Sequence, residues 1–436
     1  RALASLAPVA RSTSSRPAPG AVVERWLLRI WYGDSSPGDR TLAVLLAPLG
    51  LPLSWLVAAI ARRRLRRIRR QRPEARPHVV VIGNLVAGGA GKTPTVIALA
   101  RGLTARGHRV GLLARGYRRA TTGAPLLIDN AGTGPGADAA ATGDEPLLLF
   151  RATGLPVAVG ANRAAALDLL ARRHRDCTVV LSDDGLQHTG LARAIELAVV
   201  DERGFGNGRC LPAGPLREPA DRLASVDAVL LHRRDALPPG AAAPPLLFRI
   251  ETGIERFRAV DGSADWSPES FVAAVRSAGD SVAAVAAIAR PERFFDDLAR
   301  LGLEVSRHPL ADHAAIDPRW LAALDADRVV ITAKDAVKIA PGEATGRLVV
   351  AEQAAAVDEA LLNWLSGRLP APDFGSAMDA RLLDVLVCPI CKGPLKHDRN
   401  AATLTCVADR LVFPIRDGIP VMIESEASPL ADDAPR

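Results

Sequence analysis

Short apolar runs alternate with Ala- and Leu-rich stretches through the middle of the chain. Between residues 77 and 245, runs rich in Val, Leu and Ala fall at residues 78–83, 109–113, 156–160, 178–182, 197–201 and 228–231. Each run has the length of a strand, and the stretches between them have the composition of helices. This alternation is typical of a parallel sheet covered by helices, so the sequence predicts an α/β fold.

The same alternation continues after the proline-rich stretch at residues 237–245. Further strands are expected at residues 282–288 and 328–332, which predicts a second, smaller α/β lobe. Another break at residues 370–376 precedes a short β-rich module. The predicted domains are a disordered lead-in (1–20), a membrane-associating helical segment (21–76), a core (77–245), the second lobe (246–370) and a ribbon-like module (377–426).

An apolar segment precedes the core. Residues 42–61 contain no charged side chain and approach the length of a bilayer span, but Pro48 and Pro52 each remove a backbone donor. A bent or interfacial hairpin is therefore as well supported as a straight span. Half of the chain's Trp and Tyr residues, types that prefer the headgroup layer, lie in or before this segment: Trp26, Trp31, Tyr32 and Trp55. Membrane association is predicted; the alternative is a buried helix followed by a solvated basic tail.

The positive charge of the chain is local. The formal net charge is +7, and the eight arginines between Arg62 and Arg72 carry a charge of +8 by themselves. The remainder is close to neutral, so no nucleic-acid partner is expected. Near an anionic membrane surface each arginine contributes about 1 kcal/mol. The main basic run follows the apolar segment, whereas a secretory signal has its basic residues first, so retention on the cytoplasmic side is expected.

A glycine-rich turn follows the first strand of the core. The sequence GNLVAGGAGKTP runs from strand to helix, and its glycines let backbone amides surround phosphate oxygens at a helix N-terminus. Val86 stands where the general phosphate-loop pattern has glycine. Lys92 is expected to reach the β- and γ-phosphates of ATP, and the Thr93 hydroxyl to bind Mg²⁺. The predicted nucleotide-binding residues are Gly88, Gly89, Ala90, Gly91, Lys92, Thr93 and Pro94, which makes the core a P-loop NTPase domain.

Paired carboxylates follow another predicted strand of the core. Asp183 and Asp184 come directly after the apolar run at residues 178–182. Magnesium prefers carboxylates together with substrate phosphates, so both are candidate Mg²⁺ ligands. Paired aspartates after a strand also occur as helix caps, and that alternative stays open.

Eight motifs together carry a family resemblance. They are GNLVAGGAGKTP, ARGYRR (114–119), TGDEP (142–146), SDDGLQH (182–188), RGFGNGRCLPAGPLREP (203–219), ARPERFF (289–295), ADH (311–313) and TAKDAVK (332–338). In this order and spacing, over residues 22–366, the chain resembles the tetraacyldisaccharide 4'-kinases, the lipid A 4'-kinase family. Two positions depart from the usual pattern. Leu186 replaces an aromatic residue, and Ala333 replaces an acidic one.

The resemblance implies a reaction and a place. It implies transfer of the γ-phosphate of ATP to the 4'-hydroxyl of the tetraacyldisaccharide 1-phosphate precursor of lipid A, in lipopolysaccharide biosynthesis. The enzyme would act at the cytoplasmic face of the bacterial inner membrane, held there peripherally or by a single N-terminal anchor. The alternative is a P-loop GTPase or a metal-chaperone-type ATPase, for which the guanine-specific N-K-x-D element is not evident.

The resemblance also assigns roles to residues. Asp144 is implied as the base that accepts the hydroxyl proton, Glu145 as a further Mg²⁺ ligand, and His313 as the group that assists the base, with Lys92 as a catalytic cation. The open alternatives are a helix cap for Asp144 and a packing role for His313. The predicted substrate or nucleotide contacts are Arg115, Tyr117 and Arg217, and the role of His188 is left open.

The C-terminal module carries a cysteine cluster. It resembles the short bacterial relatives of zinc-ribbon methyltransferase-activator proteins. Cys388 and Cys391 form a knuckle of the kind that grips Zn²⁺, and Cys406 lies on a plausible facing strand. Asp409 has the spacing of the missing fourth ligand. Either a Zn²⁺ site or a ribbon held only by its apolar core is compatible with the sequence, and binding a protein partner is the expected role.

Overall fold

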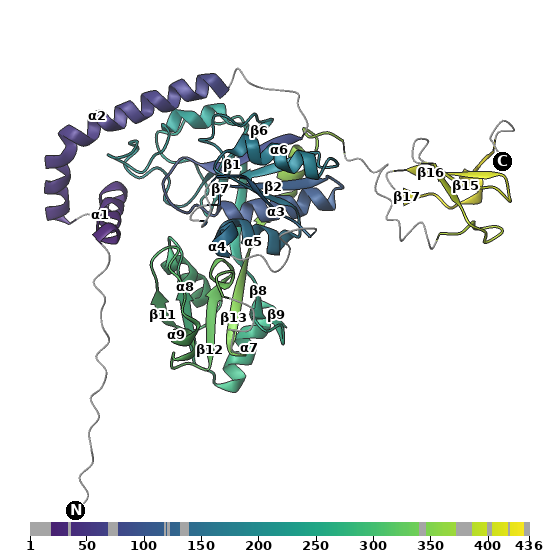
Figure 1. Ribbon diagram of the computed structural model, residues 1–436. Helices are drawn as coiled ribbons and strands as arrows, with labels where there is room; N and C mark the ends of the chain where they lie inside the picture. Colours follow the sequence, from purple (N-terminus) through teal and green to yellow (C-terminus); the bar gives the residue numbers. More distant parts are fainter. Residues whose placement is uncertain are drawn as a thin grey trace, which may run out of the picture.

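The computed structural model describes residues 19–33, 36–68, 77–116, 119, 123–130, 139–339, 346–371, 386–398, 403–416 and 419–430. Of the predicted lead-in at residues 1–20, the last two residues open the first helix, and the others lie outside the described residues. Figure 1 shows two α/β lobes, a bent N-terminal helix beside the larger lobe, and a small C-terminal sheet. The predicted α/β architecture with a β-rich C-terminal module is confirmed.

The larger lobe is built on parallel strands. The chain forms a thirteen-stranded sheet in the order β11-β10-β12-β13-β8-β7-β6-β1-β5-β2-β4-β3, with β9 paired to β8. The six strands predicted for the core are all present within two residues of their expected ends. They are β1 (His78–Asn84), β2 (Val110–Ala114), β4 (Val157–Val159), β5 (Val179–Asp183), β6 (Ile195–Val200) and β7 (Ala228–His232). A short strand, β3 (Leu126–Ile128), closes this edge in antiparallel pairing with β4.

Helices cover this sheet on both faces because its strands are apolar on both. Alternate residues of β1 belong to different core clusters, Val80 and Ile82 to one and Val79 and Val81 to the other. The first cluster includes side chains of α3 (Lys92–Ala105), α5 (Asp144–Thr153) and α11 (Glu359–Ser366). The second includes side chains of α6 (Arg163–Arg173). The 3₁₀ helix η1 (Ala220–Ser225) and the one-turn helix α4 (Ala139–Thr142) complete the lobe.

Two long strands join the lobes. β8 (Leu247–Ala259) begins parallel to β7 and then pairs antiparallel with β13 (Leu348–Val357). The smaller lobe adds β9 (Asp265–Trp266), β10 (Val282–Ala286), β11 (Ser306–Pro309), β12 (Arg328–Thr332), α7 (Pro268–Ala278), α8 (Pro291–Arg300), α9 (Pro318–Ala322) and α10 (Ala333–Ala336). After β13 the chain returns to the larger lobe, where α11 packs on α3. The domain limit at residue 245 stays a prediction, since one continuous sheet crosses it.

The N-terminal segment is helical and bent. It forms α1 (Pro19–Tyr32) and α2 (Pro37–Ile68), with both prolines inside α2. No single helix among the described residues has the length and apolarity to cross a membrane. The halves of α2, Pro37–Leu45 and Ala47–Arg66, meet that test only as a pair, bent by 68°. The bend lies where Pro48 removes a backbone hydrogen bond, as the sequence predicted.

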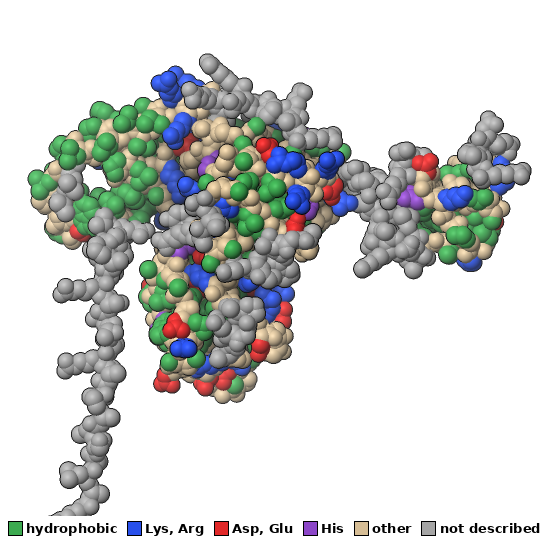
Figure 2. Space-filling model, in the orientation of Figure 1, with side chains coloured by type: hydrophobic (Ala, Val, Ile, Leu, Met, Phe, Trp, Pro, Cys, Tyr) green, Lys and Arg blue, Asp and Glu red, His purple; other side chains and the backbone are tan. Residues whose placement is uncertain are grey.

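One side of α2 is docked and the other is open. The Ser54 hydroxyl donates to the carbonyl of Cys210 at 2.8 Å, and Arg62 pairs with Asp221 at 2.9 Å. Val57 and Ala58 pack against the larger lobe. The opposite side exposes Val44, Leu45, Leu49, Leu53, Trp55, Leu56 and Ile60. Figure 2 shows this as a nearly continuous hydrophobic surface over the arch of the helix.

The C-terminal module is a five-stranded antiparallel sheet. Its strands are β14 (Lys396–Asp398), β15 (Thr403–Cys406), β16 (Leu411–Arg416), β17 (Ile419–Pro420) and β18 (Ser428–Pro429), with the 3₁₀ helix η2 (Glu424–Glu426). Its buried core contains only Cys388, Leu404, Cys406 and Phe413 within the described residues. Two of these four are cysteines, so the cysteine cluster is part of what holds the module together.

Candidate active site

The glycine-rich turn joins the end of β1 to the N-terminus of α3. Gly88 and Gly91 have φ angles of +91° and +78°, in the left-handed region that side chains disfavour. Gly91 is the N-cap of α3, and no side chain caps the helix there. The first amides of α3 are therefore available to an anion, which the positive end of the helix dipole also attracts.

A buried histidine supports this turn from behind. His232 ends β7, and a Cβ atom on Gly91 would come within 2.6 Å of its ring. Nδ1 of His232 lies 3.2 Å from the carbonyl oxygen of Ala90, and Nε2 lies 2.6 Å from a guanidinium nitrogen of Arg293. Arginine can only donate, so Nε2 accepts and the Nδ1 proton is directed at Ala90. Burial, followed by the charge of Arg293, lowers the pKa of His232 to about 4, which keeps the ring neutral.

The predicted phosphate and metal residues meet at the edge of the sheet. Nζ of Lys92 lies 3.0 Å from Oδ1 of Asn84 and 3.3 Å from Oδ1 of Asp184. The Thr93 hydroxyl donates to Oδ2 of Asp183 at 3.1 Å. β5 lies next to β1 in parallel register, so Asp183 at its end and Asp184 just after it stand beside the glycine-rich turn. The arrangement brings a lysine, a hydroxyl and two carboxylates together, as the sequence predicted.

The two aspartates differ in their electrostatic surroundings. Burial, with the charge of Glu145, raises the pKa of Asp183 to about 7. Burial also acts to raise the pKa of Asp184, but the charges of Lys92 and Arg217 outweigh it and lower that pKa well below its ordinary range. Crowded carboxylates disfavour the charged form, and a cation placed among them reverses this effect.

An unsatisfied buried oxygen in this region fits a divalent cation. Among the described residues, Oδ1 of Asp183 is buried without a hydrogen-bond partner. Buried polar atoms are normally satisfied, so this free carboxylate oxygen indicates a missing partner. Hard oxygen ligands are those that Mg²⁺ takes. Arg163 donates to the carbonyl of Asp183 at 2.7 Å.

A second pair of predicted residues meets across the lobes. Asp144 opens α5 in the larger lobe, and His313 follows β11 in the smaller one. Nδ1 of His313 lies 3.0 Å from Oδ2 of Asp144. Burial acts to raise the pKa of Asp144, but the hydrogen bond from His313 and the charge of Lys338 prevail and lower it. Asp144 is therefore an ionised carboxylate with one oxygen held by an imidazole.

Two lysines of the smaller lobe complete this cluster. Nζ of Lys334 lies 3.3 Å from Nε2 of His313 and 3.6 Å from Oε1 of Glu145. Nζ of Lys338 lies 3.9 Å from Asp144 and 2.7 Å from the buried Asp335. Both lysines belong to the TAKDAVK motif, so a role for them could have been inferred from the sequence, although only the motif itself was singled out.

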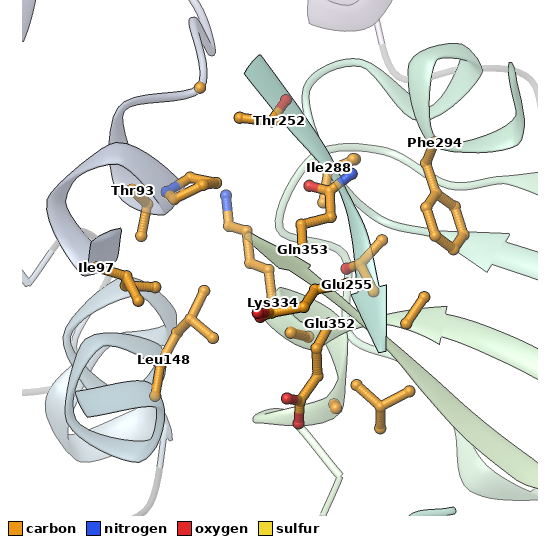
Figure 3. A pocket seen from close by; sticks show the side chains of 18 of the residues that line it. Thr93, Ile97, Leu148, Thr252, Glu255, Ile288, Phe294, Lys334, Glu352 and Gln353 are labelled. Carbon is orange, nitrogen blue, oxygen red and sulfur yellow. The ribbon is translucent and has the colours of Figure 1, made fainter. Parts of the chain in front are cut away.

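A cavity of about 600 Å³ lies between the two lobes. Residues 89–94 of the glycine-rich turn, together with Ile97 and Leu148, line one wall. Figure 3 shows Thr93, Ile97 and Leu148 on that side, facing strands that carry Thr252, Glu255, Glu352 and Gln353, with Lys334 projecting between them. The cavity is large enough for a nucleotide and has both apolar and polar walls.

The remaining predicted residues differ in how close they lie to the two aspartates. The Arg217 guanidinium contacts both carboxylate oxygens of Asp184 at 3.0 Å. Arg115 is exposed, just after β2, and Tyr117 lies outside the described residues. His188 lies near Arg163 and Arg115, and burial together with these charges lowers its pKa to about 4. Leu186 is buried against Gly83, where a Cβ atom would come within 2.7 Å of it.

Sequence reasoning missed several residues that hold the site. Some contact the glycine-rich turn, its lysine or the Asp183–Asp184 pair, and others support a residue that does. They are His232, Arg293, Arg163, Asn84 and Arg203. Arg293 and Arg203 lie in two of the eight family motifs, at positions for which no role is predicted from the sequence. Asn84 stands inside the phosphate-loop segment. His232 is a lone histidine at a strand end, and no local pattern marks it.

The C-terminal cysteines lie close together. Sγ of Cys388 and Sγ of Cys406 lie 3.0 Å and 3.2 Å from Oδ2 of Asp409, and the sulfurs of Cys391 and Cys406 are 3.6 Å apart. The four ligand atoms all lie within 4.8 Å of one another. Three sulfurs and one carboxylate at these separations could surround a tetrahedral Zn²⁺ ion.

Comparisons with known proteins match two parts of the chain. The family model of tetraacyldisaccharide-1-P 4'-kinase matches residues 45–370, and that of Trm112p-like protein matches residues 379–418. The tetraacyldisaccharide 4'-kinase of Verminephrobacter eiseniae is 40% identical over 415 residues, covering 88% of this chain and 92% of its own. The enzyme of the same name from Chromobacterium violaceum is 44% identical over 335 residues, covering 75% and 94%.

A solved structure has a similar fold. The crystal structure of LpxK from Aquifex aeolicus in complex with ATP aligns with a TM-score of 0.61 and 23% sequence identity. The alignment covers 75% of this chain and 99% of that one. At this level of identity the likeness concerns the fold.

Proposed function

The chain belongs to the tetraacyldisaccharide-1-P 4'-kinase family, and we propose that it transfers the γ-phosphate of ATP to the 4'-hydroxyl of a tetraacyldisaccharide 1-phosphate, a step in lipid A biosynthesis. The observation that carries the proposal is that two groups of residues lie beside one cavity, which is lined by Thr93 of the first group and by Lys334, a neighbour of His313 in the second. The phosphate-binding turn with its carboxylates belongs to the larger lobe. The Asp144–His313 pair, which could accept a proton, spans both lobes.

The triphosphate of ATP would lie along the glycine-rich turn. Residues 89–94 line the cavity, and the uncapped N-terminus of α3 attracts anions. Lys92 is held between Asn84 and Asp184, close to the turn, where its ammonium can neutralise charge that develops on the transferred group. The nucleoside would lie between Ile97 and the strands β8 and β13. The relative of similar fold was solved in complex with ATP, which supports ATP as the nucleotide.

Thr93, Asp183, Asp184 and Glu145 would hold Mg²⁺. The unsatisfied oxygen of Asp183 supports this assignment, as does the crowding of carboxylates that raises its pKa. The chemistry that a bound Mg²⁺ would supply is neutralisation of part of the negative charge of the phosphates. Arg217 keeps Asp184 ionised and oriented through contacts with both of its carboxylate oxygens.

The proton of the sugar hydroxyl would pass to Asp144. The oxygen of the hydroxyl forms the new bond to the γ-phosphorus, the bond to the β-γ bridging oxygen breaks, and ADP leaves with that electron pair. Asp144 is suited to accept the proton because His313 and Lys338 keep it ionised. His313 and Lys338 both contact Oδ2 of Asp144, so Oδ1 would be the oxygen that faces the hydroxyl. Arg115 and Tyr117 are proposed to contact the sugar or its phosphate.

The apolar surface of α2 would bring the enzyme to its lipid. A substrate with four acyl chains stays in a bilayer. The described side chains of α2 include seven large, exposed hydrophobic ones, while the other side of the helix is docked on the larger lobe. Arg62, Arg63, Arg64 and Arg66 follow this surface and are exposed. Such a helix binds an anionic interface, which supports a place at the cytoplasmic face of the inner membrane.

The C-terminal module would bind Zn²⁺ and a protein partner. The close approach of Cys388, Cys391, Cys406 and Asp409 supports the metal, since a buried core of four residues is small for an independent sheet. The match to Trm112p-like protein supports a role in protein interaction.

A transfer assay tests the proposed activity. Radiolabelled ATP is incubated in detergent with 1-phosphorylated tetraacyl disaccharide and with the native chain or Lys92→Ala. The native chain should label the lipid, and the variant should be slower by about two orders of magnitude or more while remaining folded. A native chain that binds ATP and never labels the lipid would contradict the proposal.

A further inference from the structure

The loop at residues 201–219 contacts the phosphate-binding turn along its length. The amide of Ala87 donates to the carbonyl of Pro215 at 2.8 Å, and the amide of Arg217 donates to the carbonyl of Leu85 at 2.6 Å. Val86 and Leu216 form an isolated antiparallel bridge. This loop, here called the bracket loop, contains the RGFGNGRCLPAGPLREP motif, most of which has no role in the proposed chemistry.

Arg203 of the bracket loop holds the outer part of the turn. Its guanidinium donates to the carbonyl of Gly89 at 2.9 Å and to that of Ala87 at 3.4 Å. Asp201, which is fully buried, accepts from the same guanidinium at 2.8 Å and fixes its position. Arginine donates in a planar fork, so one side chain can order two carbonyls of the turn at once. Gly89 lines the cavity in which ATP is proposed to bind.

The other side of the bracket loop receives the N-terminal helices. The amide of Asn207 donates to the carbonyl of Trp31 at 2.8 Å, and the Trp31 indole donates to the carbonyl of Pro212 at 3.2 Å. A Cβ atom on Gly206, whose φ is +53°, would come within 2.4 Å of the Trp31 carbonyl oxygen, so the close approach requires glycine. Ser54 of α2 donates to the carbonyl of Cys210 in the same loop.

Tyr32 connects α1 directly to Arg203. The guanidinium carbon of Arg203 lies 5.7 Å from the centre of the Tyr32 ring, within the range of a cation–π contact. The Tyr32 hydroxyl is buried and has no hydrogen-bond partner among the described residues. The contact that the structure shows between these two side chains is therefore made by the ring and not by a hydrogen bond of the hydroxyl.

From these contacts we infer that Tyr32 and Arg203 are positioning residues for the phosphate-binding turn. Through them, the N-terminal segment that faces the membrane is also a structural part of the ATP site. The inference rests on the proposed function, because it assumes that the glycine-rich turn binds the triphosphate. It adds a role for the N-terminal helices that is separate from lipid contact.

The test measures the dissociation constant of MgATP, by calorimetry, with the full chain in detergent. Tyr32→Leu keeps an apolar side chain and loses the aromatic face, and Tyr32→Phe is the matched control that loses only the unpartnered hydroxyl. We expect Tyr32→Leu to bind MgATP about fivefold to tenfold more weakly, and Tyr32→Phe to bind like the native chain. Arg203→Ala should weaken binding at least as much. Combining Tyr32→Leu with Arg203→Ala should add nothing, because both act through one contact.

Thermal melting without nucleotide separates positioning from general stability. A variant that binds weakly while melting like the native chain supports the inference. If Tyr32→Leu proves unstable, Arg203→Lys, which keeps the charge and loses the fork, provides the same test. Native-like MgATP binding by folded Tyr32→Leu or by folded Arg203→Lys overturns the inference. Lys92→Ala serves as the reference, since unchanged binding in that variant would overturn the proposed ATP site itself.

Discussion

Nδ1 of His313 lies 3.0 Å from Oδ2 of Asp144, although 169 residues separate the two in the chain. His313 has a φ of +60°, in the left-handed region that is uncommon for residues other than glycine. The two residues belong to different lobes, which β8 and β13 connect. The geometry of the proposed base therefore depends on how the lobes are placed, and a movement of either lobe would assemble or separate the pair.

Asp144→Asn should lower turnover without weakening MgATP binding. The amide cannot accept the hydroxyl proton, and general-base catalysis is typically worth about 10²–10⁴ in rate. His313→Gln should give a smaller decrease, because it removes the orientation of Asp144 and not the carboxylate. Single-turnover transfer and MgATP calorimetry measure the two effects. Equal turnover of Asp144→Asn and the native chain would exclude Asp144 as the base.

The lowered pKa of Asp144 leads to a prediction about how turnover depends on pH. His313 and Lys338 hold the pKa of Asp144 below its ordinary value against the opposing effect of burial, so its basic form persists as the pH falls. Turnover should therefore not fall between roughly pH 8 and pH 5 through protonation of Asp144. A fall in that range that disappears in Asp144→Asn would contradict this prediction.

Stability should depend on pH through His232. Burial and the charge of Arg293 lower its pKa to about 4 in the folded chain, against 6.5 ordinarily, with Glu202 opposing them and Arg233 adding to them. The unfolded chain then binds more protons between these values, so the free energy of unfolding falls as the pH drops through this range, by up to about 3 kcal/mol.

His232→Gln isolates that contribution, because its amide can still donate to the carbonyl of Ala90 and does not titrate. Denaturant unfolding at a series of pH values should give a smaller slope for the variant than for the native chain below about pH 6.5. Other groups titrate in both proteins and cancel in the comparison. Parallel slopes would mean that His232 is not held neutral by its surroundings.

The sequence predicted the buried parallel strands and missed the two strands that join the lobes. β1 and β5 are apolar on both faces and stand out as continuous runs. β8 carries Arg249, Glu251, Glu255 and Arg258 on its exposed positions, so it has the alternation of a strand with one open face and not an apolar run. β13 contains four alanines and resembles a helix in composition. Its pairing with β8 overrides that local preference.

The residues of the candidate site also divide into those that a local sequence pattern predicts and those that it does not. Residues within one local motif, such as Lys92 and Thr93, were found from the strand-turn-helix pattern alone. The meeting of Asp144 with His313 came from family resemblance, because nothing local indicates a contact between distant segments. Arg163 and His232 were missed for a related reason: each acts through a neighbour, and only the packed structure shows which neighbour that is.

The open face of α2 should govern binding to vesicles. Replacing Leu49 and Leu53 together by serine removes two exposed hydrophobic side chains, each worth roughly 1.5–3 kcal/mol when buried in an apolar phase. Partition into anionic vesicles should fall by about two orders of magnitude or more by that measure, and added salt should weaken it further by screening the arginines. Co-sedimentation measures the partition.

Ser54→Ala is the matched control for this helix. Its side chain is buried on the docked face of α2 and does not reach the open surface, so vesicle binding should stay close to native. Transfer to lipid presented in vesicles should fall in the double serine variant together with partition. Undiminished vesicle binding by the Leu49 and Leu53 variant would show that another surface contacts the membrane.

The C-terminal cluster should contain one Zn²⁺ ion per chain. The apolar core of the module is small, and Asp409 lies 3.0 Å and 3.2 Å from two of the three sulfurs, which makes it the candidate for the fourth ligand. Elemental analysis of the purified chain should find stoichiometric zinc, and Cys406→Ser should lose most of it, because it removes a thiolate. Asp409→Cys should keep the metal, since it restores a four-cysteine site.

Turnover should persist in both variants and after removal of residues 377–436, because the phosphate-binding turn and the Asp144–His313 pair lie outside the module. A zinc-free native chain with a folded module would favour a ribbon held by its apolar core alone.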